Sequence, residues 1–232
     1  MNIGKINLGK SPTVAVSFRG GVSAGTIAGV RRDGIKLAEL RIDLFKRLDS
    51  PHVLNEIKRY KGFVRIATIR SRKEGGKAHL SEKERLTLFR AILPLVEAID
   101  VELSSKTILR DLVAEARRRK KCIIISYHNF KKMPALSELQ KIVNKSLLAG
   151  ASIVKIAAMA RRTEDLKIIT ELTLENKKKN IITIAMGEKG AASRVFLPVI
   201  GSLLAYAHVG KVTAPGQLDH RTMLSLLGNI TF

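Results

Sequence analysis

The sequence predicts an α/β fold of the (β/α)₈ barrel type, formed as a single domain by residues 1–232. Three observations predict it. The chain has 232 residues, which is long enough for one large core and normal for a barrel domain. Short apolar runs rich in β-branched residues alternate with amphipathic stretches along the whole chain. There are eight such runs, and no linker or low-complexity segment separates them.

The eight apolar runs are the expected strands. They begin near Thr13, Lys36, Phe63, Ala98, Lys121, Ser152, Asn180 and Ser202. Several are nearly continuous in Ile, Val, Leu and Ala, which is typical of strands buried on both faces of a parallel sheet. Eight strands separated by helices close most simply into a barrel. A doubly wound open sheet is the alternative, but no GxGxxG turn follows the first run.

The stretches between these runs are expected to be helices. Ser81 followed by Glu84 is the pattern of a capping box, so a helix should begin there. Residues 137–148 form another predicted helix, with apolar residues at helical spacing. The basic clusters 117–121 and 177–179 are expected to end the fourth and sixth helices, because cations are favourable at helix C-termini.

The composition limits the functional classes. Lysine and arginine number 42 against 20 acidic residues, so the net charge is +22, which suits an anionic substrate or a nucleic acid. An aromatic content of 4% and basic runs without aromatic residues disfavour nucleic acid. No run reaches the roughly 18 apolar residues of a membrane helix, and no signal peptide is evident. The single cysteine, Cys122, excludes an internal disulfide and a zinc site built on cysteine pairs. We therefore expect a cytoplasmic protein with no nucleic-acid or membrane partner and no metal.

A barrel carries its chemistry at the C-terminal ends of its strands. At the end of the second run, Glu39, Arg41 and Asp43 alternate and should share the face that points into the barrel. They form either a functional site or a self-paired structural cluster. Arg70, at the end of the third run, is a candidate clamp for a substrate anion, or a surface arginine.

Two residues on the fifth and sixth runs are the strongest catalytic candidates. Lys155 lies within the apolar run IVKIAAM, where burial should lower its pKa toward neutrality and supply the amine that Schiff-base chemistry requires. The alternative is a lysine that closes a buried ion pair or reaches the rim. His128 ends the fifth run, where a proton-transfer group is useful. Asp100 and Glu102 of the fourth run are candidates for a supporting role.

The last two loops are expected to bind substrate. Arg194 follows a glycine-containing turn that presents free backbone N–H groups to an anion. Thr213 and Gln217 flank a Pro-Gly turn and are candidates for binding hydroxyls or a carboxylate, although such turns also occur without function.

Taken together, these segments resemble the type I 3-dehydroquinate dehydratases, the Schiff-base dehydratases of the shikimate pathway. The resemblance runs from about Thr13 to the C-terminus. Its motifs are Glu39-Leu40-Arg41-Ile42-Asp43, Thr68-Ile69-Arg70 with Glu74-Gly75-Gly76, Ser126-Tyr127-His128-Asn129-Phe130, Val154-Lys155-Ile156-Ala157, Met186-Gly187 with Ser193-Arg194, and Ala214-Pro215-Gly216-Gln217. One departure is Thr213, where the family often has serine. Threonine also carries a hydroxyl, so we expect substrate binding to be retained.

The resemblance implies a role for each position. Lys155 forms the imine with the ketone of 3-dehydroquinate, His128 is the general acid and base, and Glu39 supports proton handling. The substrate-binding residues are Arg41, Arg70, Arg194, Thr213 and Gln217, and the apolar pocket walls are Met159, Phe130 and Met186. No metal or organic cofactor is implied. A Schiff-base aldolase acting on a phosphorylated sugar is the second hypothesis, because Arg194 and its turn would suit phosphate as well. The sequence does not decide the oligomeric state, for which a homodimer is our expectation.

Overall fold

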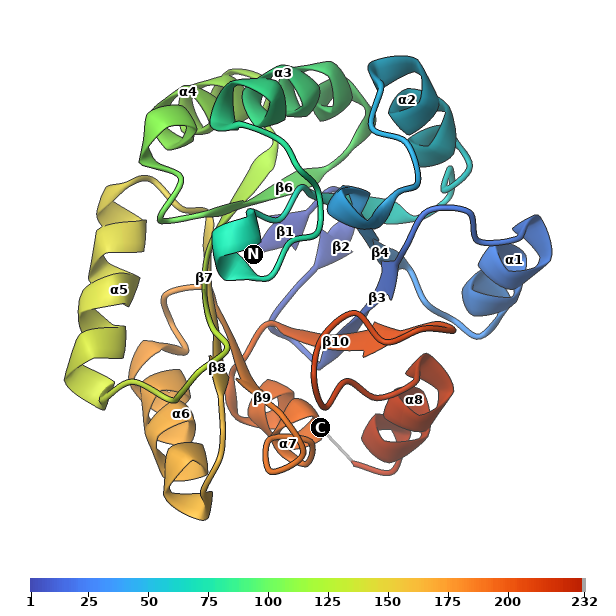
Figure 1. Ribbon diagram of the computed structural model, residues 1–232. Helices are drawn as coiled ribbons and strands as arrows, with labels where there is room; N and C mark the ends of the chain where they lie inside the picture. Colours follow the sequence, from blue (N-terminus) through green and yellow to red (C-terminus); the bar gives the residue numbers. More distant parts are fainter. Residues whose placement is uncertain (231–232) are drawn as a thin grey trace.

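The protein is a barrel of eight parallel strands with helices around it, in a computed structural model that describes residues 1–230 (Figure 1). The strands are β3 Thr13–Phe18, β4 Leu37–Arg41, β5 Val64–Thr68, β6 Ala98–Glu102, β7 Cys122–Asn129, β8 Ile153–Met159, β9 Ile181–Met186 and β10 Leu204–His208. Each begins within two residues of a predicted run. The strand order is β10-β3-β4-β5-β6-β7-β8-β9, so the predicted barrel is confirmed.

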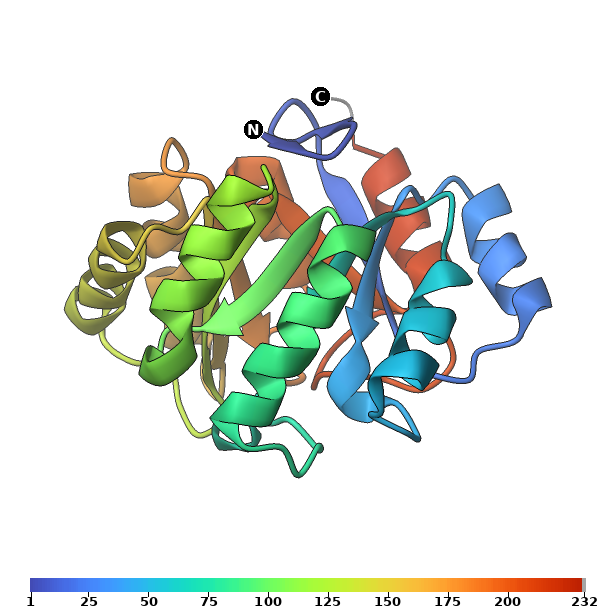
Figure 2. The same cartoon turned by 90° about the horizontal axis from the view of Figure 1, so that it is seen from above.

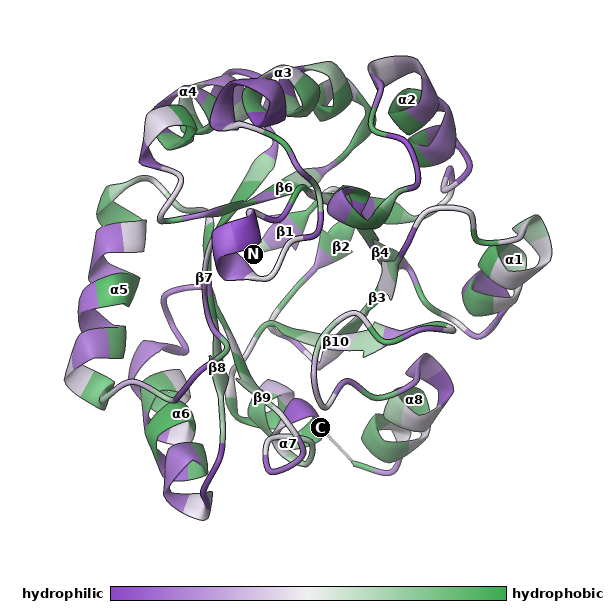
Figure 3. Ribbon diagram, in the orientation of Figure 1, coloured by the Kyte–Doolittle hydropathy of each residue, from purple (hydrophilic) through white to green (hydrophobic). Residues whose placement is uncertain are grey.

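Within residues 1–230, eight α-helices follow the strands in turn. They are α1 Ala24–Arg32, α2 Ser50–Lys58, α3 Glu82–Ile92, α4 Lys106–Arg118, α5 Leu136–Leu148, α6 Thr163–Asn176, α7 Ser193–Ile200 and α8 His220–Gly228. The helices mix hydrophilic and hydrophobic residues, whereas the strands are mainly hydrophobic (Figure 3). In this part of the chain, none of the helices combines the length and the apolar character that crossing a membrane requires.

The predicted helix starts and the predicted basic helix ends are confirmed. The Ser81 hydroxyl accepts a bond from the Glu84 backbone N–H, and the Glu84 carboxylate accepts one from the Ser81 N–H at 2.7 Å. The second predicted helix is α5, which begins one residue earlier than expected. The two basic clusters lie at the C-terminal ends of α4 and α6, as expected from the helix dipole.

Two apolar layers build the core. The strands direct one set of side chains outward against the helices and the alternate set inward, as the pleat requires. On β8, Val154 and Ile156 pack outward, whereas Ile153 and Ala157 belong to the inner cluster. Lys155 lies between those two inner residues, so the alternation directs its side chain into the barrel.

A short hairpin closes the end of the barrel away from the strand C-termini (Figure 2). Its strands are β1 Asn2–Ile3 and β2 Ile6–Asn7. Ile3 is fully buried and Leu8 is nearly so, and both pack into the inner cluster. The sequence does not predict this hairpin, because strands of two residues carry no detectable periodicity.

The barrel is nearly closed, with a seam between β9 and β10. Within residues 1–230 no strand ladder joins these two strands. Two bonds link them near their N-terminal ends: Leu203 N donates to the Ile181 carbonyl at 2.9 Å, and Thr183 N donates to the Ser202 hydroxyl at 3.0 Å. The seam therefore lies between the two strands whose loops carry Arg194 and Gln217.

Candidate active site

A single cavity at the C-terminal ends of the strands collects the eight residues predicted to act in catalysis or substrate binding. They are Glu39, Arg41, Arg70, His128, Lys155, Arg194, Thr213 and Gln217. The cavity volume is about 80 Å³, below the range of about 300–1,000 Å³ that is usual for ligand sites. The eight residues therefore lie together at the end of the barrel where the chemistry was expected.

Lys155 is paired with two carboxylates. Its Nζ lies 2.9 Å from Asp100 Oδ2 and 3.5 Å from Glu39 Oε1. It also lies 4.1 Å from the centre of the Tyr206 ring, within cation–π range. Lys155 therefore forms the buried ion pair that was the alternative prediction for it. The ammonium must lose a proton before the amine can attack a carbonyl carbon.

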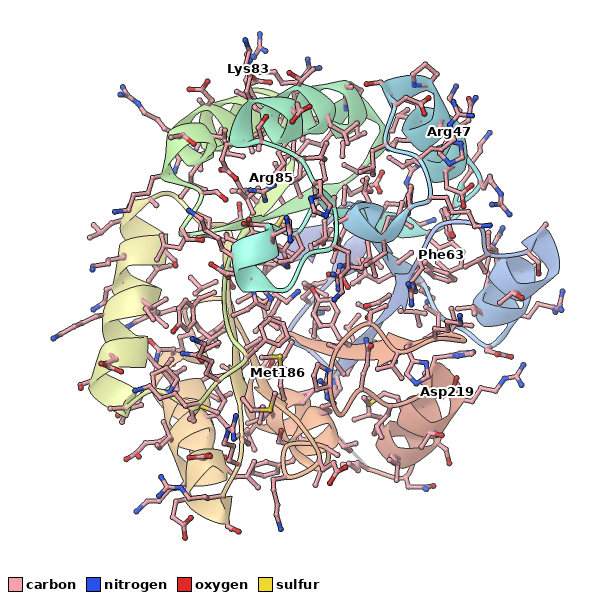
Figure 4. All side chains as sticks on the ribbon, in the orientation of Figure 1. Arg47, Phe63, Lys83, Arg85, Met186 and Asp219 are labelled. Carbon is pink, nitrogen blue, oxygen red and sulfur yellow. The ribbon has the colours of Figure 1, made fainter. Side chains whose placement is uncertain are left out.

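The pairing extends outward from Asp100 as a chain of alternating charges. Arg70 bonds Asp100 at 2.9 Å and Glu102 at 2.8 Å, and Arg85 bonds the other oxygen of Glu102. Arg85 points from α3 toward the barrel, whereas Lys83 of the same helix points away (Figure 4). Burial alone would raise the pKa of Asp100, but the charges of Arg70 and Lys155 hold it well below its usual range.

The motif at the end of β4 forms part of the cavity wall, with one difference from the prediction. Asp43 does not continue the strand with Glu39 and Arg41, because β4 ends at Arg41 and a 3₁₀ turn, η1 Ile42–Leu44, follows. The turn still brings Asp43 back to Arg41, which donates to its two oxygens at 2.9 and 2.8 Å. This pair fixes the guanidinium at the edge of the cavity.

His128 is held by the carboxylate of Glu74, for which no role was predicted from the sequence. Glu74, in the 3₁₀ turn η2 Arg72–Glu74, accepts a bond from the His128 backbone N–H at 2.8 Å and lies 3.0 Å from its Nδ1. Its other oxygen accepts a bond from the Ser104 hydroxyl at 2.6 Å. Its signal in the sequence was its place in the motif Thr68-Ile69-Arg70 with Glu74-Gly75-Gly76, four residues after Arg70.

Burial sets the proton affinities of this pair. It raises the pKa of Glu74 to about 7, although the Ser104 bond and the charge of Arg70 lower it. Burial, together with the charges of Arg70 and Lys155, also lowers the pKa of His128 well below its usual value. Neutral imidazole is therefore the resting form, which is suited to accept a proton.

Arg194 is buried without a carboxylate partner in residues 1–230. One of its terminal nitrogens donates to the Pro215 carbonyl at 2.7 Å, whereas its buried Nε has no hydrogen-bond partner in that part of the chain. Burial lowers its pKa to about 10. A buried guanidinium with free donors is suited to bind an anion from solution.

Thr213 and Gln217 are bonded to each other in the loop after β10. Gln217 Oε1 accepts bonds from the Thr213 hydroxyl at 2.8 Å and from its N–H at 3.1 Å. Gly216 has φ +70°, and a Cβ there would lie 2.3 Å from the Gly187 carbonyl oxygen. Only glycine therefore lets this loop approach the loop after β9.

Two of the three expected apolar walls line the cavity. Met186 is buried, and Phe130 is 38% exposed with its ring stacked against His128. Met159 does not line the cavity, because its side chain lies against the turn at Gly187. Tyr206 lines the cavity beneath Lys155 and was not predicted.

Comparison with known proteins identifies the family of the chain. The profile of the family described as Type I 3-dehydroquinase matches residues 24–231. A 3-dehydroquinate dehydratase of Methanosarcina barkeri is 33% identical over 231 residues, which cover 94% of this chain and 95% of that one. The crystal structure of the 3-dehydroquinate dehydratase from Geobacillus kaustophilus HTA426 superposes with a TM-score of 0.88 at 26% identity and covers 98% of this chain and 97% of that one. The type I enzyme of Clostridium difficile, solved with covalently modified comenic acid, has a TM-score of 0.86 at 26% identity, with 98% and 96% covered. The chain belongs to the type I 3-dehydroquinase family.

Proposed function

We propose that this protein dehydrates 3-dehydroquinate to 3-dehydroshikimate through an imine on Lys155, the third step of the shikimate pathway toward aromatic amino acids. The observation that carries the proposal is the cavity itself. It joins a buried lysine, paired with Asp100 and Glu39, to a histidine held by Glu74. Membership of the family and the covalently modified ligand of a relative support it.

The first stage is imine formation. Lys155 Nζ, once deprotonated, attacks the ketone carbon, and the carbonyl π electrons move to oxygen. The carbinolamine then loses water, which leaves a protonated C=N bond on Lys155. Asp100 and Glu39 face this nitrogen and stabilise its positive charge as they stabilise the ammonium.

The second stage is elimination. The protonated imine draws electrons from the neighbouring C–H bond, and neutral His128 takes that proton to leave an enamine. The enamine electrons reform the imine as the β-hydroxyl leaves with a proton from His128, so water is lost. Hydrolysis of the new imine returns the Lys155 amine and releases the enone product. In this proposal the chemistry uses no metal or organic cofactor.

Substrate binding is assigned to the cations and amides of the rim. Arg194, whose buried donors are incompletely used, takes the substrate carboxylate. Arg41 and Arg70 hold the ring hydroxyls and carboxylate, together with the Thr213–Gln217 pair. A phosphorylated sugar, the aldolase alternative, gains no support from the family to which the chain belongs.

Borohydride trapping tests the proposal. The protein is incubated with 3-dehydroquinate, reduced with sodium borohydride and mapped by peptide mass spectrometry. A reduced adduct on the peptide that contains Lys155 is expected. Absence of an adduct, or an adduct on another lysine, would refute the assignment.

Replacing Glu74 by glutamine should change the pH dependence. In the wild type, kcat should rise as the pH passes about 7, because an ionised Glu74 stabilises the imidazolium that forms on His128. In Glu74→Gln this limb should disappear and kcat should fall about 10–100-fold, the range for removing the hydrogen-bond partner that orients a metal-binding histidine. A pH profile of kcat measures both effects.

Stability supplies a second measurement on this variant. The folded-state pKa of Glu74 lies above its unfolded value, so its contribution to stability is present below about pH 4.3 and is lost as the pH rises through about 7. Glu74→Gln should therefore gain stability relative to the wild type above neutral pH. Glu138→Gln, at an exposed position of α5, is the control and should retain both wild-type profiles.

Replacing Arg194 by methionine should weaken substrate binding but stabilise the folded protein. KM should rise by about 100-fold with the loss of a charge-assisted bond, whereas the free energy of unfolding should increase by about 1 kcal/mol or more, because an uncompensated buried cation is removed. Steady-state kinetics and urea unfolding measure the two effects. Arg118→Met on the exposed end of α4 is the control, and a less stable Arg194→Met protein would contradict the electrostatic argument.

We also propose that the protein acts in the cytoplasm as a homodimer, without a nucleic-acid partner. The lone buried thiol of Cys122 is compatible with a reducing compartment. Sedimentation equilibrium tests the dimer. A salt titration of DNA binding tests the absence of a nucleic-acid partner. Only weak binding that vanishes at physiological salt is expected.

A further inference from the structure

A second and larger hollow lies outside the barrel, between α4 and α5. Its volume is about 830 Å³, within the range of about 300–1,000 Å³ typical of small-molecule sites. The apolar side chains that line it include Leu109, Val113, Tyr127, Ile142 and Leu148. Leu148 is 88% exposed, which is unusual for a large apolar side chain. We call this hollow the α4–α5 groove.

Basic side chains surround the apolar floor. They are Lys106, Arg110 and Arg117 from α4 and Lys145 from α5, and none of them pairs with a carboxylate within residues 1–230. The acidic residues of α4, Asp111 and Glu115, lie on its other side and pair with Arg90 of α3. Helix α4 therefore presents an unneutralised positive face to the groove.

The groove reaches the catalytic cavity through one carboxylate. Glu74 lines both of them. On the groove side its Oε1 accepts a bond from Ser104, which lines the groove, and on the cavity side its Oε2 holds His128. A molecule that contacts Ser104 in the groove thus lies two hydrogen bonds from the imidazole.

We propose that the α4–α5 groove binds an anion with an aromatic or similarly broad apolar body, and that occupancy acts on His128 through Ser104 and Glu74. The apolar floor takes the body, and the unpaired cations take the anionic group. A second copy of the chain fits less well, because a two-fold contact would bring the same four cations against each other. The effect on turnover rests on the proposed function, whereas binding does not.

Binding is tested with 8-anilinonaphthalene-1-sulfonate and with N-phenyl-1-naphthylamine, which has the same rings without the charge. In the double variant Arg110→Gln/Lys145→Gln, the affinity for the sulfonate should fall about tenfold or more while that for the neutral amine is kept. The matched control Arg118→Gln/Lys141→Gln removes the same charge from the same two helices outside the groove, and its affinity should stay within about twofold of wild type.

Coupling is tested without substrate, so that its failure is distinguishable from failure of the dehydration proposal. The sulfonate should shift the imidazole NMR resonances of His128, and Ser104→Ala should keep the affinity but reduce the shift. Equal sulfonate affinity in the two double variants would overturn the proposal, as would a His128 that does not respond. Displacement of the probe by 3-dehydroquinate that is equally strong in Ser104→Ala would place the probe in the catalytic cavity, because displacement through the coupling depends on Ser104. Tighter binding on dilution would show that a second copy covers the groove, and each of these two results also overturns the proposal.

Discussion

Lys155→Met is expected to lose at least about 10⁴-fold in kcat and to give no borohydride adduct, because methionine has no nucleophile to form the imine. The same change should lower the free energy of unfolding by about 3–5 kcal/mol, since it leaves Asp100 and Glu39 without their shared cation in a buried site. Kinetics, trapping and urea unfolding measure the three effects.

Lys155→Arg is the matched control. Arginine retains the positive charge between the two carboxylates but forms no imine with a ketone. It should be as inactive as Lys155→Met yet lose less stability. Retained turnover in either variant would contradict covalent catalysis, and equal stability of the two would contradict the electrostatic role of the ammonium.

His128→Ala is expected to reduce dehydration by about 10²–10⁴-fold, the range for loss of a general acid and base. The imine on Lys155 should still form, because the lysine and its two carboxylates are untouched. Borohydride trapping should therefore still label Lys155, and rapid-quench measurements should show that the bound substrate accumulates instead of product.

His128→Asn is the control for position. Its side-chain amide can still donate to Glu74 but cannot accept and return a proton near neutral pH. It should lose as much activity as the alanine variant while keeping more stability. An active asparagine variant would show that His128 orients groups and does not transfer protons.

Much of the fold could be predicted from the sequence because buried parallel strands need long apolar runs. All eight strands were predicted in this way, and the capping box at Ser81 placed the start of α3. The N-terminal hairpin could not be, because its two short strands depend on packing of Ile3 and Leu8 against the barrel floor. Asp43 was misplaced because strict alternation takes no account of where a strand ends.

For the site, the alternation of strand side chains indicated which residues share the lumen but not how they pair. Lys155 was predicted to point inward, yet its bond to Asp100 joins strands 55 residues apart in sequence. The pairing of His128 with Glu74 spans 54 residues and depends on a 3₁₀ turn that the sequence did not predict. Such contacts arise from tertiary packing, for which a single sequence contains no local signal.

The alternating chain of charges from Arg85 through Glu102, Arg70 and Asp100 to Lys155 also bears on how this protein can change over evolutionary time. Loss of any one member removes one ion-pair partner from each neighbour and changes the net charge of a dry interior, so a substitution along the chain is expected to be costly. Arg85 belongs to an outer helix, a part of a barrel that usually tolerates replacement. Sequence drift on α3 is therefore restricted at that position by chemistry that takes place on the other side of the barrel wall.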